Sequence, residues 1–175
     1  SKNAQLDEAV YEQIAAMPEV EVAAPVLELD LAVRGQRSAL KLLGIDGFQS
    51  ALISPDLMGQ PEEDKPFDTL MADTIFLSPA AMTWLHLRTG DTLTLVAGTR
   101  HVSLRVAGSL LRARPGQRLA VMDIGSAQWQ FARLGQLSHI DIKLVPGANR
   151  SAFKTRLEQV QNSLIIVEAE DQDKR

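Results

Sequence analysis

The sequence lacks several features that would each indicate a function. It has no cysteine, so disulfide bonds and cysteine-ligated zinc are excluded. No run of apolar residues approaches the roughly 18 that a membrane-spanning helix needs, and the longest, such as 164–167, have the length of a strand. No low-complexity tract or long run of charge indicates disorder. The net charge is −4, so the basic face typical of nucleic-acid-binding proteins is not expected.

The remaining composition is that of a globular protein. Hydrophobic residues make up 45% of the chain and charged residues 23%. A length of 175 residues suits one ordinary domain or two small lobes that share a chain. The sequence begins at Ser1 with neither a methionine nor a signal peptide, and we interpret it as an excised or processed fragment.

The first 72 residues predict one helix, one hairpin and one irregular segment. Helical spacing is shown by Leu6, Val10, Ile14 and Met17, followed by Pro18 as a stop. Alternating apolar and charged residues predict a strand over 27–33, a turn at 34–37 and a returning strand over 40–45. Several prolines, Gly59 and the acidic Glu62-Glu63-Asp64 predict an irregular excursion over 47–72.

The rest of the chain alternates short strands with short helices. Strands are predicted at 75–77, 92–96, 102–110, 119–122, 140–144 and 164–167. Helices are predicted to begin at Ser78-Pro79 and to end near Gly90, to run from an Asp123 cap to about Arg133, and to cover 152–160. Between Leu87 and Leu93, Gly90 supplies a positive φ and Asp91 caps the turn. Both chain ends have a helix and then a strand, and the middle is β-rich, which predicts an α+β fold.

The segment VMDIGSAQWQF at 121–131 has the strand–turn–helix pattern of a nucleophile elbow or a phosphate loop. Ser126 would lie within the first helical turn, and the motif G-x-S-x-G is absent. Gly125 is the only glycine of this segment, whereas a phosphate loop needs several glycines and usually a lysine. We therefore interpret Asp123 as a helix cap rather than as a ligand.

No catalytic or metal-binding set can be assembled from the sequence. The three histidines, His86, His101 and His139, have no ligand spacing and are interpreted as structural or solvated. The acidic run at 62–64 lacks the spaced oxygens of a calcium loop. Both tryptophans, Trp84 and Trp129, lie in predicted helices and are interpreted as packing residues. We therefore expect no enzyme activity, no catalytic residue and no metal site.

One loop is a candidate for partner binding. Arg112, Arg114 and Arg118 flank Pro115-Gly116 at the end of a strand. Arginine is enriched at protein interfaces, and a stiff loop loses little entropy on docking. A solubilising turn is the alternative interpretation. The candidate partner-binding residues are Arg112, Arg114, Pro115 and Arg118.

A resemblance emerges from the order of several short motifs. They are PEVEVAAP at 18–25, GIDGF at 44–48, FLSPAAMTWLHLRTGDTL at 76–93, VAGSL at 106–110, VMDIGSAQ at 121–128 and LSHIDIKL at 137–144. In this order they resemble the extracytoplasmic domain of an ABC transporter permease of the FtsX/MacB/LolC type. The resemblance covers nearly the whole chain, and the strand–Asp–helix piece ending in Ala127-Gln128 is the most characteristic.

The resemblance implies an architecture and a location. Such a domain lies between the first and second transmembrane helices, on the periplasmic side of the bacterial inner membrane. It implies a porter-like α/β lobe built from residues 1–46 and 119–175, and an inserted β-rich lobe at 47–118. Lipoprotein-releasing members carry a hook that grips a chaperone, and the loop at 112–118 lies in a broadly similar region but is short.

The resemblance also implies a mode of action. ATP is hydrolysed by a separate cytoplasmic ABC ATPase, and the domain itself holds no cofactor. It would dock an envelope partner or substrate: an adaptor, a chaperone, a lipoprotein, a lipid, a peptide or a regulator of cell-wall hydrolases. The alternative is a freestanding periplasmic module that binds a ligand or lipid in a groove between lobes. We expect no nucleic-acid partner, and a monomer in isolation.

Overall fold

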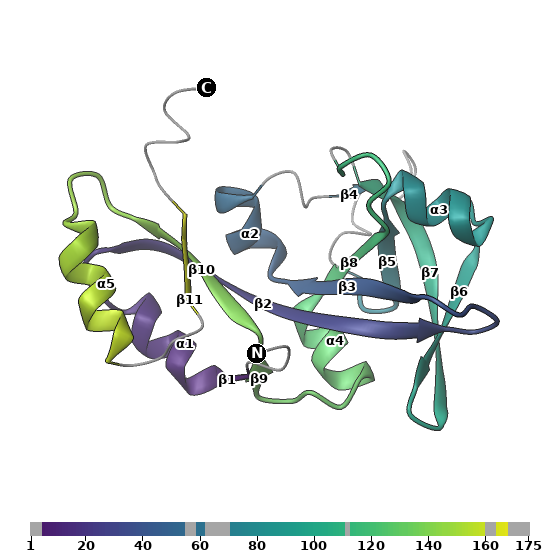
Figure 1. The fold of residues 1–175 in the computed structure, drawn as a ribbon, viewed down its shortest axis with the longest axis horizontal. Coiled ribbons are helices and arrows are strands. Elements are labelled where there is room, and N and C mark those ends of the chain that lie inside the picture. Colours follow the sequence, from purple (N-terminus) through teal and green to yellow (C-terminus); the bar gives the residue numbers. More distant parts are fainter. Residues whose placement is uncertain (1–4, 55–58, 62–70, 111–112, 160–163, 168–175) are drawn as a thin grey trace.

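The computed structural model describes residues 5–54, 59–61, 71–110, 113–159 and 164–167 (Figure 1). Over these residues the chain forms five helices, a nine-stranded sheet and a two-stranded sheet, so the predicted α+β class is confirmed. Within this described part, no helix combines the length and the apolar character needed to span a bilayer.

The elements alternate along the chain. The helices are α1 (Glu8–Ala15), α2 (Gly47–Ile53), α3 (Pro79–Leu85), α4 (Ile124–Gln130) and α5 (Arg150–Glu158). The strands of the first half are β1 (Leu6–Asp7), β2 (Val20–Val33), β3 (Ala39–Ile45), β4 (Gly59–Pro61) and β5 (Thr74–Leu77). Those of the second half are β6 (Thr92–Ala97), β7 (Arg100–Leu110), β8 (Leu119–Asp123), β9 (Gln136–Leu137), β10 (His139–Leu144) and β11 (Leu164–Val167).

Six strands of the large sheet form a closed ring. The pairing runs β2–β3–β8–β5–β7–β6, and β6 pairs back with β2 through Ala32–Val96 and Val33–Leu95. Closure removes the exposed edges that an open sheet would leave. The ring encloses apolar residues that alternate along its strands: Leu27, Leu31, Leu40, Leu42, Ile75, Leu77, Leu93, Leu95, Leu104, Val106 and Met122. Ala81 of α3 and Ala127 of α4 belong to the same cluster.

The other end of the molecule is a small sheet covered by two helices. The first half of β2 pairs antiparallel with β10, and β10 pairs parallel with β11 (Figure 1). One buried cluster joins this sheet to α1 and α5: Leu6, Ile14, Ala23, Leu137, Ile140, Ile142, Leu144, Phe153 and Leu157. Strand β2 is 14 residues long and belongs to both ends, so it connects them rigidly.

Strand β2 contains Pro25, which cannot donate a ladder hydrogen bond. The carbonyl of Val26 accepts from the N–H of Ser138, so Val26 directs its backbone groups toward β9 and β10. Pro25, one residue earlier, therefore directs its nitrogen to the opposite side. The pairing with β3 reaches only to Val26 on that side, so the ladder loses no bond there.

Several predicted boundaries were wrong. Strand β2 begins at Val20 rather than at residue 27, because its first half pairs with β10. The segment after residue 46 begins with helix α2 instead of irregular chain. The side chain of Asp46 accepts from the N–H groups of Phe48 and Gln49, at 3.0 and 3.1 Å, and so caps this helix.

Three helices are shorter than predicted, among them α4, which ends at Gln130 rather than near Arg133. Helix α1 begins at Glu8, because Leu6 and Asp7 pair with β9. Helix α3 ends at Leu85, followed by His86 in the left-handed region with φ of 55°. The predicted glycine turn follows it: Gly90 has φ of 95°, and Asp91 accepts from the N–H of Arg88 at 2.8 Å.

The predicted division into two lobes stays a prediction. The closed ring takes β2, β3 and β8 from the predicted porter-like segments and β5, β6 and β7 from the predicted insertion at 47–118. The acidic residues at 62–64 lie outside the described residues.

Candidate partner-binding surface

The predicted basic loop is a tight turn between β7 and β8. The N–H of Gln117 donates to the carbonyl of Arg114 at 3.0 Å, and Gly116 has φ of 78°. Proline at the second position and a positive-φ glycine at the third are the pattern of a type II turn. Arg112 lies outside the described residues. The turn therefore presents Arg114 and Pro115 on a backbone that its own sequence fixes.

A buried serine anchors this turn to the rest of the fold. The hydroxyl of Ser78 donates to the carbonyl of Gln117 at 2.5 Å. It also accepts from the N–H of Leu119 at 3.0 Å and from that of Ala81 at 3.2 Å. The first two bonds fix the end of the loop, and the third caps α3, as the sequence predicted. One hydroxyl thus joins the loop, β8 and α3.

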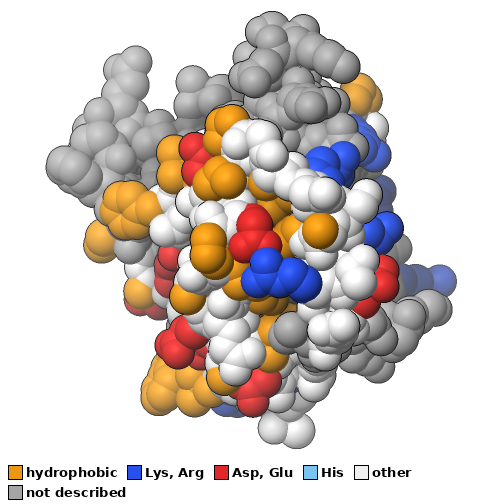
Figure 2. Space-filling model, turned by 90° about the vertical axis from the view of Figure 1, so that its left-hand side faces the viewer, with side chains coloured by type: hydrophobic (Ala, Val, Ile, Leu, Met, Phe, Trp, Pro, Cys, Tyr) orange, Lys and Arg blue, Asp and Glu red, His pale blue; other side chains and the backbone are white. Residues whose placement is uncertain are grey.

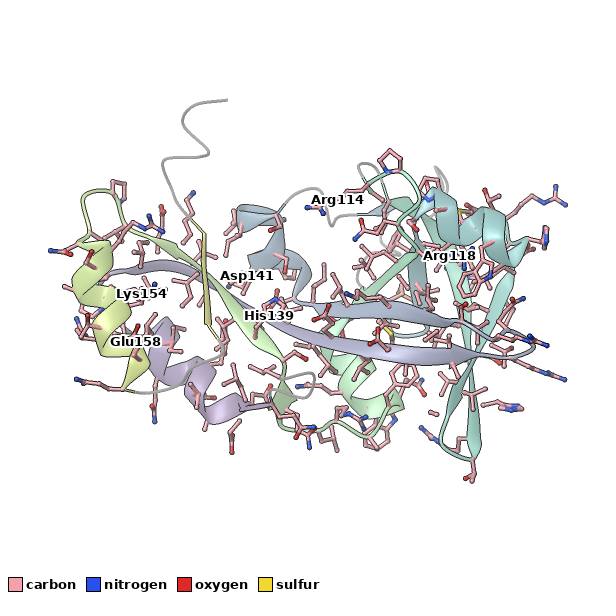
Figure 3. The ribbon with its side chains drawn as sticks, viewed as in Figure 1. Arg114, Arg118, His139, Asp141, Lys154 and Glu158 are labelled. Atoms are coloured by element: carbon pink, nitrogen blue, oxygen red, sulfur yellow. The ribbon has the colours of Figure 1, made fainter. Side chains whose placement is uncertain are left out.

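The arginines of the loop differ in their surroundings. The guanidinium of Arg118 lies over the ring of Trp84, 4.3 Å from its centroid, which is a cation–π contact. Both arginines are exposed, but Arg114 takes part in the turn through its backbone carbonyl, whereas the guanidinium of Arg118 has the ring contact. Both lie on one side of the molecule, near α3 and the end of β7 (Figure 3). Arg114 is therefore the better candidate for a partner contact, and Arg118 supports α3.

The strand–Asp–helix segment is a helix cap, as predicted. The carboxylate of Asp123 accepts from the N–H of Ser126 at 2.9 Å and from its hydroxyl at 3.2 Å. Ser126 lies within α4 and donates to the cap, rather than projecting from a sharp turn as a nucleophile does.

The histidines do not gather with other ligands. His86 and His101 are exposed, and His139 lies 3.5 Å from a carboxylate oxygen of Asp141 on β10 (Figure 3). Burial raises the pKa of Asp141 above its ordinary value, and the charge of His139 opposes this shift. Within the described ranges, no group of three or more histidine, aspartate or glutamate residues could hold a metal ion.

The two tryptophans also differ. Trp84 is half-buried and packs against the ring core, as predicted. Trp129 is 70% exposed, so its interpretation as a packing residue was wrong. Successive helical residues rotate by about 100°, so Trp129 lies opposite the buried Ala127, two positions earlier. The helical period over 124–131 contained this signal.

The fold has known relatives among solved structures. The chain, with its closed six-stranded ring and its helix-covered sheet, is similar in fold to extracytoplasmic domains of transporters and permeases. The resemblance predicted from the ordered motifs is thereby confirmed at the level of the fold, while the division into two lobes stays a prediction. In sequence, no family model and no characterised protein match the chain.

Three solved structures carry this conclusion. The chain is similar to the periplasmic region of MacB from Actinobacillus actinomycetemcomitans, with 12% identity, 89% of this chain and 72% of that chain covered, and a TM-score of 0.57. It is also similar to the extracellular domain of the noncanonic ABC-type transporter YknZ from Gram-positive bacteria. The identity is 13%, the match covers 91% of this chain and 87% of that chain, and the TM-score is 0.59. The third structure is a domain of a putative permease protein from Porphyromonas gingivalis. The identity is 13%, the match covers 90% of this chain and 77% of that chain, and the TM-score is 0.50. At such identities the similarity shows the fold alone.

Proposed function

We propose that the chain is the extracytoplasmic domain of an FtsX/MacB-like ABC transporter permease, on the periplasmic side of the inner membrane. The observation that carries this proposal is the shared fold, which extends over 89–91% of the chain in three transporter or permease domains. The ordered motifs of the sequence support it independently. The domain docks an envelope partner or substrate, while a separate cytoplasmic ATPase supplies the energy of ATP hydrolysis.

The structure suggests how such a domain transmits movement. Strand β2 belongs to both the helix-covered sheet and the closed ring, so a displacement of one end moves the other. The loop at 113–118 is joined to the ring through Ser78. A partner held at Arg114 would therefore follow the ring without a flexible joint between them.

The first test concerns the chain on either side of the domain. The proposal expects a hydrophobic span of about 20 residues on each flank in the full gene product. A full-length sequence without such spans would overturn the proposal and favour a freestanding module.

The second test concerns the docking site. A photo-crosslinker replaces Arg114, and the domain is exposed to envelope extract from its source cell. The matched control places the crosslinker at Lys154, an exposed residue of α5 at the far end of the molecule (Figure 3). The proposal expects one dominant adduct at position 114 that is absent at position 154. Equal adducts at both positions would remove the loop as the docking site.

A further inference from the structure

Exposed apolar side chains occur at the end of α4 and in the segments joined to it. Five large hydrophobic residues are exposed over the described part of the chain: Phe48, Leu52, Met71, Trp129 and Leu134. Phe48 and Leu52 belong to α2. The other three come from the end of α4, the turn after it and the segment before β5. We call Met71, Trp129 and Leu134 the α4 rim; they are 53%, 70% and 65% exposed.

Hydrogen bonds join the three segments of the α4 rim. The side chain of Gln130, next to Trp129, donates to a carboxylate oxygen of Asp73 at 3.4 Å, which connects α4 to the segment of Met71. The guanidinium of Arg100, at the tip of the β6–β7 hairpin, donates to the carbonyl of Gln130. Figure 1 shows α4 and this hairpin tip along the lower side of the molecule. The rim thus combines the end of helix α4 with two neighbouring loop segments, and hydrogen bonds hold them together.

The turn that carries Leu134 is held in an unusual conformation. Ala132 has φ of 56°, in the left-handed region that favours glycine. The guanidinium of Arg133 donates to the carbonyls of Phe131 and Ala132, at 3.0 and 3.4 Å. The backbone N–H of Arg133 donates to the backbone carbonyl of Gln128. These bonds fix the turn and direct the chain so that Leu134 is exposed.

The chain enters the domain beside this rim. Leu6 pairs with Leu137, and the N–H of Glu8 donates to the carbonyl of Gly135 at 2.9 Å, directly after Leu134. In the proposed permease, a membrane-spanning helix precedes the domain. That helix would therefore tether this side of the molecule to the bilayer, and even a weak contact would then form because its effective concentration is high.

The chemistry of the rim fits the boundary between acyl chains and headgroups. Tryptophan is enriched at this depth of a bilayer, and leucine belongs to the apolar faces that insert there. The neighbouring charges are mixed, since Asp7, Glu8 and Asp73 accompany Arg100 and Arg133. The rim therefore offers apolar insertion rather than attraction to anionic lipid. Separate segments suit a deformable surface better than a rigid protein face.

We propose that the α4 rim inserts into the outer leaflet of the membrane that anchors the domain, with Trp129 and Leu134 as the main contacts. This inference rests on the proposed function, because a domain without a neighbouring span has no tether. It adds a second contact on the side opposite the docking loop.

The chain contains two tryptophans, so a single-tryptophan variant isolates the rim. The W84F domain, with a histidine tag before Ser1, is bound to phosphatidylcholine vesicles that contain a nickel-chelating lipid. The emission of Trp129 is recorded on vesicles of ordinary and of brominated phosphatidylcholine. We expect a blue shift on the first and quenching on the second, unchanged at high salt, because apolar insertion is not screened. If W84F does not fold, the wild-type domain is compared with W129F instead.

Matched controls separate the rim from the rest of the surface. Leu134→Ser should reduce the shift and the quenching, whereas Phe48→Ser on α2 should leave both unchanged. Equal emission on both vesicles, or quenching that needs anionic lipid and disappears at high salt, would overturn the inference. A blue shift that rises with protein concentration in the absence of vesicles would assign the rim to a second copy of the chain. Spans flanking the domain in the gene would leave the proposed function standing in each of these cases.

The surface of the helix-covered sheet offers a further control for the vesicle experiment. Figure 2 shows the end of the molecule formed by the helix-covered sheet, where hydrophobic, acidic and basic side chains are interspersed. Variants on α5, such as Lys154→Ser, should therefore not change the vesicle signal, since that residue projects from this mixed surface.

Discussion

The loop at 113–118 and the turn at 131–135 lie on opposite sides of the closed ring (Figure 1), and in each of them one arginine contacts the rest of the protein. Arg118 stacks on Trp84, and Arg133 donates to backbone carbonyls of its own turn. Among the exposed residues, the loop presents the cation Arg114 and the turn presents the apolar Leu134.

The difference shows what an arginine-rich motif can indicate. The sequence contained a basic loop, yet one of its described arginines supports a helix and the other is available to a partner. The turn at 131–135 also contains an arginine, but the large hydrophobic side chain that it exposes is Leu134. The chemistry that each turn offers therefore depends on which side chain the backbone already uses.

The largest expected effect is on the anchor of the loop. Ser78→Ala removes a fully buried hydroxyl that bonds Gln117, Leu119 and Ala81. The carbonyl and two N–H groups lose their partner, so the free energy of unfolding should fall by about 2–4 kcal/mol. Urea denaturation measures this loss. The control is Ser103→Ala, an exposed hydroxyl on β7, which should change stability by less than about 0.5 kcal/mol. Equal effects of the two substitutions would show that Ser78 does not anchor the loop.

The next effect is on the helix that leads into the turn at 131–135. Asp123→Ala removes the carboxylate that caps α4 through Ser126. Loss of a helix cap should cost about 1 kcal/mol. Thermal denaturation of this variant is compared with that of Asp123→Asn, which keeps an acceptor oxygen and should recover most of the loss. A larger loss in the asparagine variant than in the alanine variant would contradict the capping role.

These two anchors also show what the sequence could predict. Ser78-Pro79 and Asp123 were recognisable because an N-cap depends on local chemistry, and both caps are confirmed. Asp46 had the same local signal, but the prolines that follow it favoured an irregular segment. The exposure of Trp129 was available from the helical period.

Other features depend on contacts that are distant in sequence. The first half of β2 reads as loop until β10, more than 100 residues later, is placed beside it. The closure of the ring needs Ala32 and Val96 to meet, and no local pattern encodes that pairing. The stacking of Arg118 on Trp84 likewise joins an element to a loop 34 residues away. For the candidate site, the loop could therefore be predicted from the sequence, but the different roles of Arg114 and Arg118 could not.

A smaller change, an increase in the free energy of unfolding, is expected in the turn at 131–135. Ala132→Gly should raise the free energy of unfolding by about 0.5–1 kcal/mol, because glycine adopts a φ of 56° without the strain that a Cβ causes. Ala9→Gly, at an exposed position of α1, is the matched control and should lower it by about 0.5–1 kcal/mol. Chemical denaturation of both variants gives the two signs. A loss in both would show that the turn does not strain Ala132.

The smallest effect separates the two arginines of the loop. Arg118→Gln removes the cation–π contact with Trp84 and should lower the free energy of unfolding by about 0.5–1 kcal/mol. Arg114→Gln should change it by less than about 0.5 kcal/mol, because the exposed side chain of Arg114, unlike that of Arg118, does not lie over the ring of Trp84. The fluorescence of Trp84, recorded in a W129F background, should change in the first variant and not in the second.

Crosslinking to the partner should rank the two variants in the opposite order to stability. Arg114→Gln should reduce crosslinking from the neighbouring position 115, whereas Arg118→Gln should leave it nearly unchanged as long as α3 keeps its place. If Arg118→Gln abolished crosslinking while Trp84 emission stayed the same, Arg118 would be the residue that contacts the partner. Stability and binding would then depend on the same side chain, and the contrast between the two arginines would be lost.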